Sequence, residues 1–207
     1  MELKNVKYYS GDIAPFAGLK DNSVQDFEML YDNSAIESTF VVFTPVAYPI
    51  PNQWKLVHQI DMFQMVYESK QLPAGDDLDF RNLDKSHVEE MLALVKLTEP
   101  GPFRSRTIEF GNYTGVMNSD ALVAMAGHRF SPTPYVEISA VCTHPNHLGK
   151  GYAFGLIREQ IKRIVEKSET PFLHVRNDND GAVKLYQKLG FHIRSEMIAY
   201  VIQKVVK

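Results

Sequence analysis

Two glycines in the segment HPNHLGKGYA, residues 144–153, could help to bind a phosphate group. Gly149 and Gly151 permit a tight turn whose backbone N–H groups point inward. The helix predicted to follow presents unpaired N–H groups and the positive end of its dipole, and Lys150 adds a positive charge. Two common phosphate loops do not fit, because Lys150 precedes Gly151 rather than Ser or Thr, and Phe154 replaces the third glycine of a dinucleotide loop. A glycine-rich turn that only reverses the chain is the alternative interpretation.

A second pattern follows at residues 177–191, NDNDGAVKLYQKLGF, and it resembles motif B of the GCN5-related N-acetyltransferase (GNAT) superfamily. That motif reads Asn-x-x-Ala-x-x-Leu-Tyr-x-Lys-x-Gly-Phe. It matches this chain at Asn179, Ala182, Leu185, Tyr186, Lys188, Gly190 and Phe191.

The segment with the two glycines resembles motif A of the same superfamily, whose pyrophosphate loop reads Arg/Gln-x-x-Gly-x-Gly/Ala. The loop runs here from Leu148 to Ala153, and Leu148 departs from the pattern because Arg or Gln is usual there. The motifs occur in the order of the family, and TPFLHVRNDN and VCTHPNHLGKGYA resemble its FR47-like branch. The chain is therefore identified as a member of that branch.

The resemblance implies transfer of acetyl from acetyl-CoA to the amine of a small-molecule or peptide acceptor, by direct attack in a ternary complex. Such a transfer needs a neutral amine, a stabilised oxyanion and help for the leaving thiolate. Glu137 is the candidate base, because the resemblance places this position towards the acceptor; an ion pair with a structural role is the alternative. Tyr186 is the candidate acid near the thioester sulfur, and a core-filling aromatic is the alternative.

The resemblance also assigns residues to the cofactor. The backbone from Val141 to Thr143 would pair with the pantetheine arm like an added strand, and the N–H of Val141 would hold the thioester oxygen. Asn179 would contact the arm, and the apolar residues Ala182 and Phe191 would pack against it, although both could equally be core residues. The predicted cofactor-binding residues are Val141, Cys142, Thr143, Leu148, Gly149, Lys150, Gly151, Tyr152, Ala153, Asn179, Ala182 and Phe191.

Cysteine and histidine residues near these motifs invite different chemistry. Cys142 could accept an acyl group, but a lone cysteine on an apolar strand is more often a small buried hydrophobe. His144 and His147 are three residues apart without an obvious third ligand, so we expect no metal. His174, on a predicted buried strand, is most simply a core histidine.

The elements that must position these residues predict an α/β (α+β) fold, and the resemblance implies the GNAT fold, a mixed central sheet flanked by helices. Hydrophobic periodicity and capping signals predict helices over 24–32, 152–167 and 180–189. A further helix is predicted to begin at the capping box of Ser86 and Glu89. Strands are predicted at 38–45, 78–83, 106–111, 121–129, 135–143, 171–176 and from Phe191 onwards. Residues 54–67 fit either a strand or a helix.

The segment SKQLPAGDD, residues 69–77, is the predicted boundary between two parts. Residues 1–74 would form a smaller N-terminal α/β subdomain, for which a degenerate GNAT-like half is one interpretation. Residues 75–207 would form the acetyltransferase domain. The acceptor would be selected by the N-terminal part and by residues 98–118, where Arg104 and Arg106 either meet an acidic acceptor or, as we favour, face solvent.

The composition excludes several classes of protein. The 207 residues carry a net charge of −3 and lack a long block of Lys and Arg, so nucleic acid is not an expected ligand. No apolar run approaches a membrane-spanning length, and the N-terminal residues do not resemble a signal peptide. Together with the single cysteine, these features predict a cytoplasmic protein. Either a monomer or a homodimer is expected. A non-catalytic acyl-CoA sensor on the same fold is the rival function.

Overall fold

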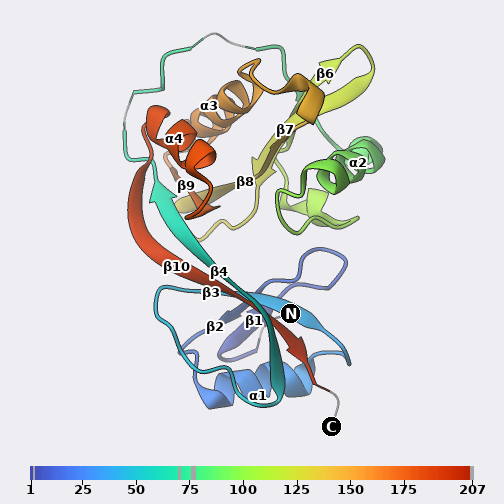
Figure 1. Cartoon of the computed structure of the whole chain (residues 1–207), viewed down its shortest axis with the longest axis vertical. Coiled ribbons are helices and arrows are strands. Elements are labelled where there is room, and N and C mark those ends of the chain that lie inside the picture. Colours follow the sequence, from blue (N-terminus) through green and yellow to red (C-terminus); the bar gives the residue numbers. More distant parts are fainter. Residues whose placement is uncertain (2, 70, 76–77, 206–207) are drawn as a thin grey trace.

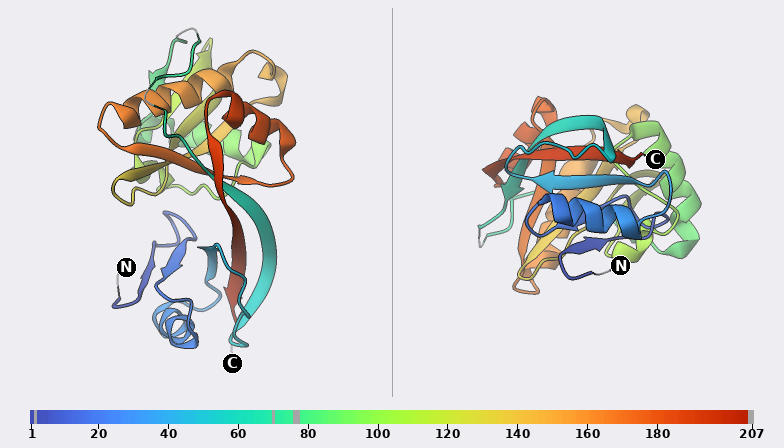
Figure 2. Two further views of the ribbon diagram at one scale, coloured as in Figure 1. Left: turned by 90° about the vertical axis from the view of Figure 1, so that its left-hand side faces the viewer. Right: turned by 90° about the horizontal axis from the view of Figure 1, so that it is seen from below.

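Two long antiparallel strands, β4 (Trp54–Val66) and β10 (His192–Lys204), run through both halves of the molecule (Figure 1). The computed structural model describes residues 1, 3–69, 71–75 and 78–205. Figure 2 shows how the two strands curve from the half with most of the helices to the half with the N-terminus. They therefore tie the two halves together through backbone hydrogen bonds.

An eight-stranded mixed sheet in the order β3-β10-β4-β9-β8-β7-β6-β5 forms the framework. Its other strands are β3 (Thr39–Thr44), β5 (Arg81–Asn82), β6 (Thr114–Asn118), β7 (Ala121–His128), β8 (Tyr135–Thr143) and β9 (Thr170–Arg176). Only β8 and β9 pair in parallel; the other neighbours in this sheet are antiparallel. The predicted mixed α/β fold is confirmed, and residues 54–67 form the strand rather than the helix.

Helices cover both faces of the sheet around β7 and β8. Met125 of β7 packs in one core with Met91 and Leu94 of α2 (Val88–Thr98). The next residue, Ala126, packs in another core with Leu156 of α3 (Tyr152–Val165). Since successive strand residues point to opposite faces, α2 and α3 lie on opposite sides. The fourth helix, α4 (Asp180–Lys188), shares a core with α3.

The N-terminal half contains the hairpin of β1 (Val6–Tyr8) and β2 (Ala17–Leu19) and the helix α1 (Val24–Asn33). Ser23 caps α1, because its hydroxyl accepts a hydrogen bond from the N–H of Asp26 at 3.2 Å. The core of this half also includes Tyr200 and Ile202 of β10. The last strand of the chain therefore completes the core of its first part.

The predicted boundary after residue 74 lies in the connection between β4 and β5. Residues 70, 76 and 77 of that connection lie outside the described residues. The strands β3 and β4, which precede it, pair with β10 and β9, which follow it. Both sides of the boundary therefore contribute strands to one sheet.

Three local predictions were wrong. Residues predicted as a strand at 106–111 form a 3-10 helix, Thr107–Phe110, because N–H groups bond to carbonyls three residues back. Of the strand predicted at 78–83, only Arg81–Asn82 pairs. The capping box before α2 uses Asp84 and His87 around a short 3-10 turn, Lys85–His87, two residues earlier than predicted.

Candidate active site

The strands β8 and β9 diverge next to the predicted cofactor residues. They pair over only three residues, Tyr135–Glu137 with Thr170–Phe172, although β8 continues to Thr143. A bulge opposite β7 and a left-handed backbone at Ala140, with φ of 52°, bend β8 just after the divergence. The backbone of Val141–Thr143 consequently lies beyond the paired region, where an extended chain can hydrogen bond to it as an added strand does.

The loop with the two glycines lies between the end of β8 and the start of α3. Gly149 and Gly151 have φ of 76° and 78°, a left-handed conformation that favours glycine. A Cβ atom added at either position would meet nothing within 4 Å. Gly151 caps α3 without a side-chain hydrogen bond, and its carbonyl accepts the helical bond from Gly155 N–H at 3.0 Å. Open space therefore borders both glycines, next to the first turn of α3, whose N–H groups have no partner within the helix, as anion binding requires.

The side chains of this loop add one positive charge. Lys150 Nζ lies 3.3 Å from His147 Nδ1, and His144 Nδ1 accepts the N–H of Asn146 at 3.1 Å. Leu148, which stands at the Arg/Gln position of the motif, is 65% exposed. The two histidines are thus engaged in the local structure of the loop, and Lys150 is its cationic side chain.

A cavity of about 280 Å³ adjoins the bulge of β8 and contains several of the predicted site residues. We call it the chamber; its lining includes Arg129, Ser139, Ala140, Val141, His174 and Tyr186. Val141 and Tyr186 come from β8 and α4, and the chamber brings them together. Glu137 does not line it.

Tyr186 is the candidate acid, and it is only 9% exposed. Its ring packs edge-on against Phe191 with the centroids 6.1 Å apart. Burial raises the pKa of its hydroxyl to about 12, so the group is protonated at neutral pH and available as a donor. Asn179 positions this helix, because its side-chain oxygen caps α4 by accepting the N–H of Ala182 at 3.1 Å.

Glu137 is fully buried and held by two partners. Arg129 Nε donates to its Oε2 at 2.8 Å, Arg129 Nη2 donates to Oε1, and His174 Nδ1 also donates to Oε1 at 2.7 Å. Burial alone would raise the pKa of this carboxyl, but the charge and hydrogen bonds of Arg129 and His174 outweigh it and lower the pKa to about 2. Glu137 is therefore ionised, and the geometry matches the ion-pair interpretation more closely than direct contact with an acceptor.

His174 was predicted as a core histidine, and it is buried, with 4% of its side chain exposed. The Oε1 of Gln64 accepts from Arg194, so its amide Nε2, 3.1 Å from His174 Nε2, is the donor. His174 Nδ1–H thus points at Glu137 and Nε2 carries the lone pair, in the arrangement of a carboxylate-oriented base. The only signal in the sequence was its position on a buried strand next to β8.

Comparison with known proteins places these features in a family. A family model described as FR47-like protein matches residues 113–200. A GNAT-family protein from Novosphingobium aromaticivorans has a similar structure, with a TM-score of 0.91 and 30% identity over 99% of this chain and 91% of that one. The chain belongs to the GNAT family.

Two curated proteins are similar to part of this GNAT chain. N-alpha-acetyltransferase RimI of Mycobacterium tuberculosis is 32% identical over 83 residues, 39% of this chain and 51% of that protein. Mycothiol acetyltransferase of Corynebacterium aurimucosum is 34% identical over 70 residues, 33% of this chain and 23% of that protein. The GNAT chain thus spans about half or less of the length of these relatives.

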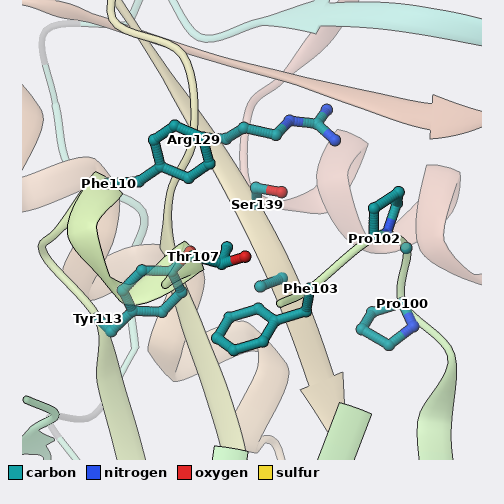
Figure 3. A pocket seen from close by; sticks show the side chains of 10 residues that line it. Pro100, Pro102, Phe103, Thr107, Phe110, Tyr113, Arg129 and Ser139 are labelled. Atoms are coloured by element: carbon teal, nitrogen blue, oxygen red, sulfur yellow. The ribbon is translucent and has the colours of Figure 1, made fainter. Parts of the chain in front are cut away.

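The small cavity in Figure 3 adjoins the chamber of the GNAT protein, and the loop after α2 forms one wall of both. Behind this loop, Arg106 donates to Asp12 and to Glu109, at distances of 2.8–2.9 Å. The hydroxyl of Thr107 donates to the carbonyl of Ile13 at 2.5 Å. The side chain of Arg106 is 49% exposed and Arg104 is exposed as well, in agreement with the favoured prediction of solvent, while the ion pair with Asp12 also links Arg106 to the N-terminal half.

Cys142 of the GNAT protein is buried against α2, and burial raises its pKa to about 11. At neutral pH about one thiol in ten thousand is then ionised, against a few per cent for a free cysteine. We expect a thiol reagent to label the native protein at least about 100-fold more slowly than the protein in denaturant. Equal labelling rates, measured by absorbance, would show that Cys142 is accessible.

No described helix of this GNAT protein is both long and apolar enough to cross a membrane. Within the described ranges, no three His, Cys, Asp or Glu side chains gather as metal ligands would.

Proposed function

We propose that this GNAT protein is an N-acetyltransferase that moves acetyl from acetyl-CoA to the amine of a small-molecule or peptide acceptor in a ternary complex. The observation that carries the proposal is the divergence of β8 from β9, which leads from the Gly149–Gly151 loop to a chamber lined by Tyr186. A phosphate site, an extended edge and a hydroxyl donor thus follow one another, as a long acyl-CoA requires.

The residues present suit acetyl-CoA as the acyl donor. The open space over Gly149 and Gly151 would accept the pyrophosphate, with the N–H groups of Tyr152 and Ala153 and the charge of Lys150 nearby. The backbone of Val141, Cys142 and Thr143 would pair with the pantetheine arm. Thr143 Oγ1 is buried without a hydrogen-bond partner in the described ranges, which fits a site completed by a polar ligand. Leu148 would contribute its backbone, Asn179 would contact the arm, and Ala182 and Phe191 would pack against it.

The reaction forms a bond from the amine nitrogen to the acetyl carbon and breaks the bond from that carbon to sulfur. Tyr186 would donate its proton to the departing thiolate, and the N–H of Val141 would stabilise the oxyanion. Both residues line the chamber, whereas Glu137 lies behind its wall.

The proton of the amine needs a second acceptor, and we assign it to the pair of Glu137 and His174. Glu137 was predicted to act directly or through water, but its carboxylate oxygens are occupied by Arg129 and His174. His174 lines the chamber and bears the lone pair on Nε2, so it would take the proton once the acceptor displaces the amide of Gln64. Glu137 would then be a positioning residue that stabilises the imidazolium.

Binding of acetyl-CoA tests the donor site, and Gly151→Ala is the sharpest variant. The new Cβ would intrude into the open space above the N–H groups, and alanine is strained at φ of 78°. We expect calorimetry to show at least a tenfold rise in Kd, about 1.4 kcal/mol. Gly11→Ala is the control, since an added Cβ at Gly11 also meets nothing within 4 Å, but the backbone of Gly11 is not in the left-handed conformation. No binding of acetyl-CoA by the native protein at about 1 mM would contradict the proposed function.

A further inference from the structure

A second and larger cavity, of about 730 Å³, also has His174 in its lining. We call it the aromatic cleft, because its walls are formed largely by Tyr8, Tyr9, Phe16, Phe43, Phe130 and Phe172. The N-terminal hairpin and its loop supply one wall, and β9 with the loop after β7 supplies another. The volume is in the range of about 300–1,000 Å³ that is typical of sites for small molecules.

The aromatic cleft and the chamber share three lining residues, Phe16, Phe43 and His174. Phe43 stacks on His174 with the ring centroids 4.7 Å apart. A molecule with its body in the cleft can therefore direct one end past these rings towards His174 and the chamber.

The walls of the cleft are held in place by packing. The ring of Phe130 meets Phe16 edge-on at 5.0 Å and Phe43 at 6.2 Å, and the Arg129 guanidinium lies over all three rings at 4.8–5.3 Å. The hairpin loop is fixed from behind by the ion pair of Arg106 and Asp12 at 2.9 Å. Such a preformed site favours a rigid ligand, because little conformational entropy is lost on binding.

The chemistry of the lining defines the ligand. Its polar side chains include Lys7, Gln64, Ser131 and His174, and none of the described lining residues is Asp or Glu. A polyamine or a lysine-rich peptide carries several positive charges, and their burial here would lack a carboxylate partner. An aromatic ring, by contrast, matches walls that offer edge-to-face and offset contacts.

We infer that the acceptor is a primary arylalkylamine, whose ring lies in the aromatic cleft and whose amine reaches His174. The inference rests on the proposed function, because it takes the chamber as the place of transfer. It makes the N-terminal hairpin the part of the chain that selects the acceptor. Tyr9, which is 37% exposed and lines the cleft, is the least disruptive residue to remove.

Two measurements test the inference separately from the transfer reaction. Calorimetry of the protein saturated with CoA would compare phenethylamine and tryptamine with spermidine and with hexylamine. We expect both arylalkylamines to bind at least tenfold more tightly than the other amines, and Tyr9→Ala to weaken them about tenfold. Ile36→Ala, an exposed apolar residue outside the cleft, should leave their Kd unchanged.

Turnover of the same amines with acetyl-CoA gives the second readout. Acetylation with kcat/KM at least tenfold higher for the arylalkylamines supports both ideas. Tight binding of arylalkylamines without transfer supports the cleft and overturns the proposed function. Transfer to spermidine or hexylamine at equal or higher kcat/KM overturns the inference and keeps the proposed function. Equal binding of all four amines, together with transfer, has the same meaning.

Discussion

Replacement of Tyr186 by phenylalanine should lower kcat by about 100-fold or more while the Kd for acetyl-CoA stays nearly unchanged. The variant keeps the ring that packs on Phe191 and removes only the hydroxyl at the chamber. Loss of a positioned general acid typically costs 10²- to 10⁴-fold, roughly 3–5 kcal/mol of barrier. Because the hydroxyl has a raised pKa of about 12, it is a donor throughout the neutral range.

The measurement compares single-turnover rates with calorimetric affinity for acetyl-CoA. Tyr67→Phe is a matched control, since Tyr67 belongs to the same core and its hydroxyl donates instead to the carbonyl of Gln71. We expect that control to keep its rate within about twofold, because a hydroxyl outside the site contributes nothing to the transition state. A Tyr186→Phe enzyme as fast as the native protein would remove Tyr186 from the mechanism.

Replacement of Glu137 by glutamine should destabilise the protein by about 3–5 kcal/mol, since it leaves the Arg129 charge buried without its partner. For a chain of this size that loss lowers Tm by roughly 6–20 °C. Asp178→Asn removes an exposed carboxylate from Arg176 and should cost at most about 1 kcal/mol. Equal free energies of unfolding for the native protein and Glu137→Gln in urea would show that the buried pair of Glu137 and Arg129 contributes nothing to stability.

The pH dependence of that difference has a definite sign. The pKa of Glu137 is about 2 in the folded protein, below the ordinary value of 4.5. Its contribution to stability is therefore fully present above about pH 4.5 and is lost as pH falls towards 2. The gap in unfolding free energy between the native protein and Glu137→Gln should shrink over this interval. A gap that grows on acidification would contradict the assignment.

Glu137→Gln also separates the structural role of Glu137 from its role in orienting His174, when rates are measured well below the Tm of the variant. If Glu137 orients His174, both Glu137→Gln and His174→Gln should lower kcat/KM by about 100-fold. His174→Gln should also flatten the acidic side of the pH–rate profile, because it removes the proton acceptor, whereas Glu137→Gln keeps the imidazole and should move that side to lower pH, because the imidazolium loses its anionic partner. A merely structural loss would leave the profile in place. An unchanged profile in folded His174→Gln would exclude His174 as the proton acceptor.

The elements around the proposed cofactor residues could be predicted from the sequence because their signals are local. Gly149 and Gly151 are required by backbone conformation, and Asn179 is a helix cap, so both follow from short patterns. The strand that contains Glu137 was predicted at its observed bounds, Tyr135–Thr143, from its β-branched and apolar residues. Local chemistry was thus sufficient for the elements around the predicted acyl-CoA site.

The acceptor side could not be predicted in this way, because its contacts join distant segments. The hydrogen bond from Thr107 to Ile13 spans 94 residues, and the one from Gln64 to His174 spans 110. Residues 106–111, whose pattern is typical of a strand, form a 3-10 turn that is held to the N-terminal half by the first of these bonds. The partners of Glu137, Arg129 and His174, are likewise 8 and 37 residues away, so its low pKa has no local signature.

The route of β10 has a consequence for how the chain acquires its structure. Tyr200 and Ile202 complete the core around Phe27 and Trp54, so these earlier segments lack two of their core residues until β10 has been synthesised. The antiparallel pairing of β10 with β3 joins residues such as Val201 and Val41, and such distant pairings close slowly. We therefore expect the hairpin that forms one wall of the aromatic cleft to reach its final packing late, after the loop of Gly149 and Gly151 and the helix α3 have their local partners.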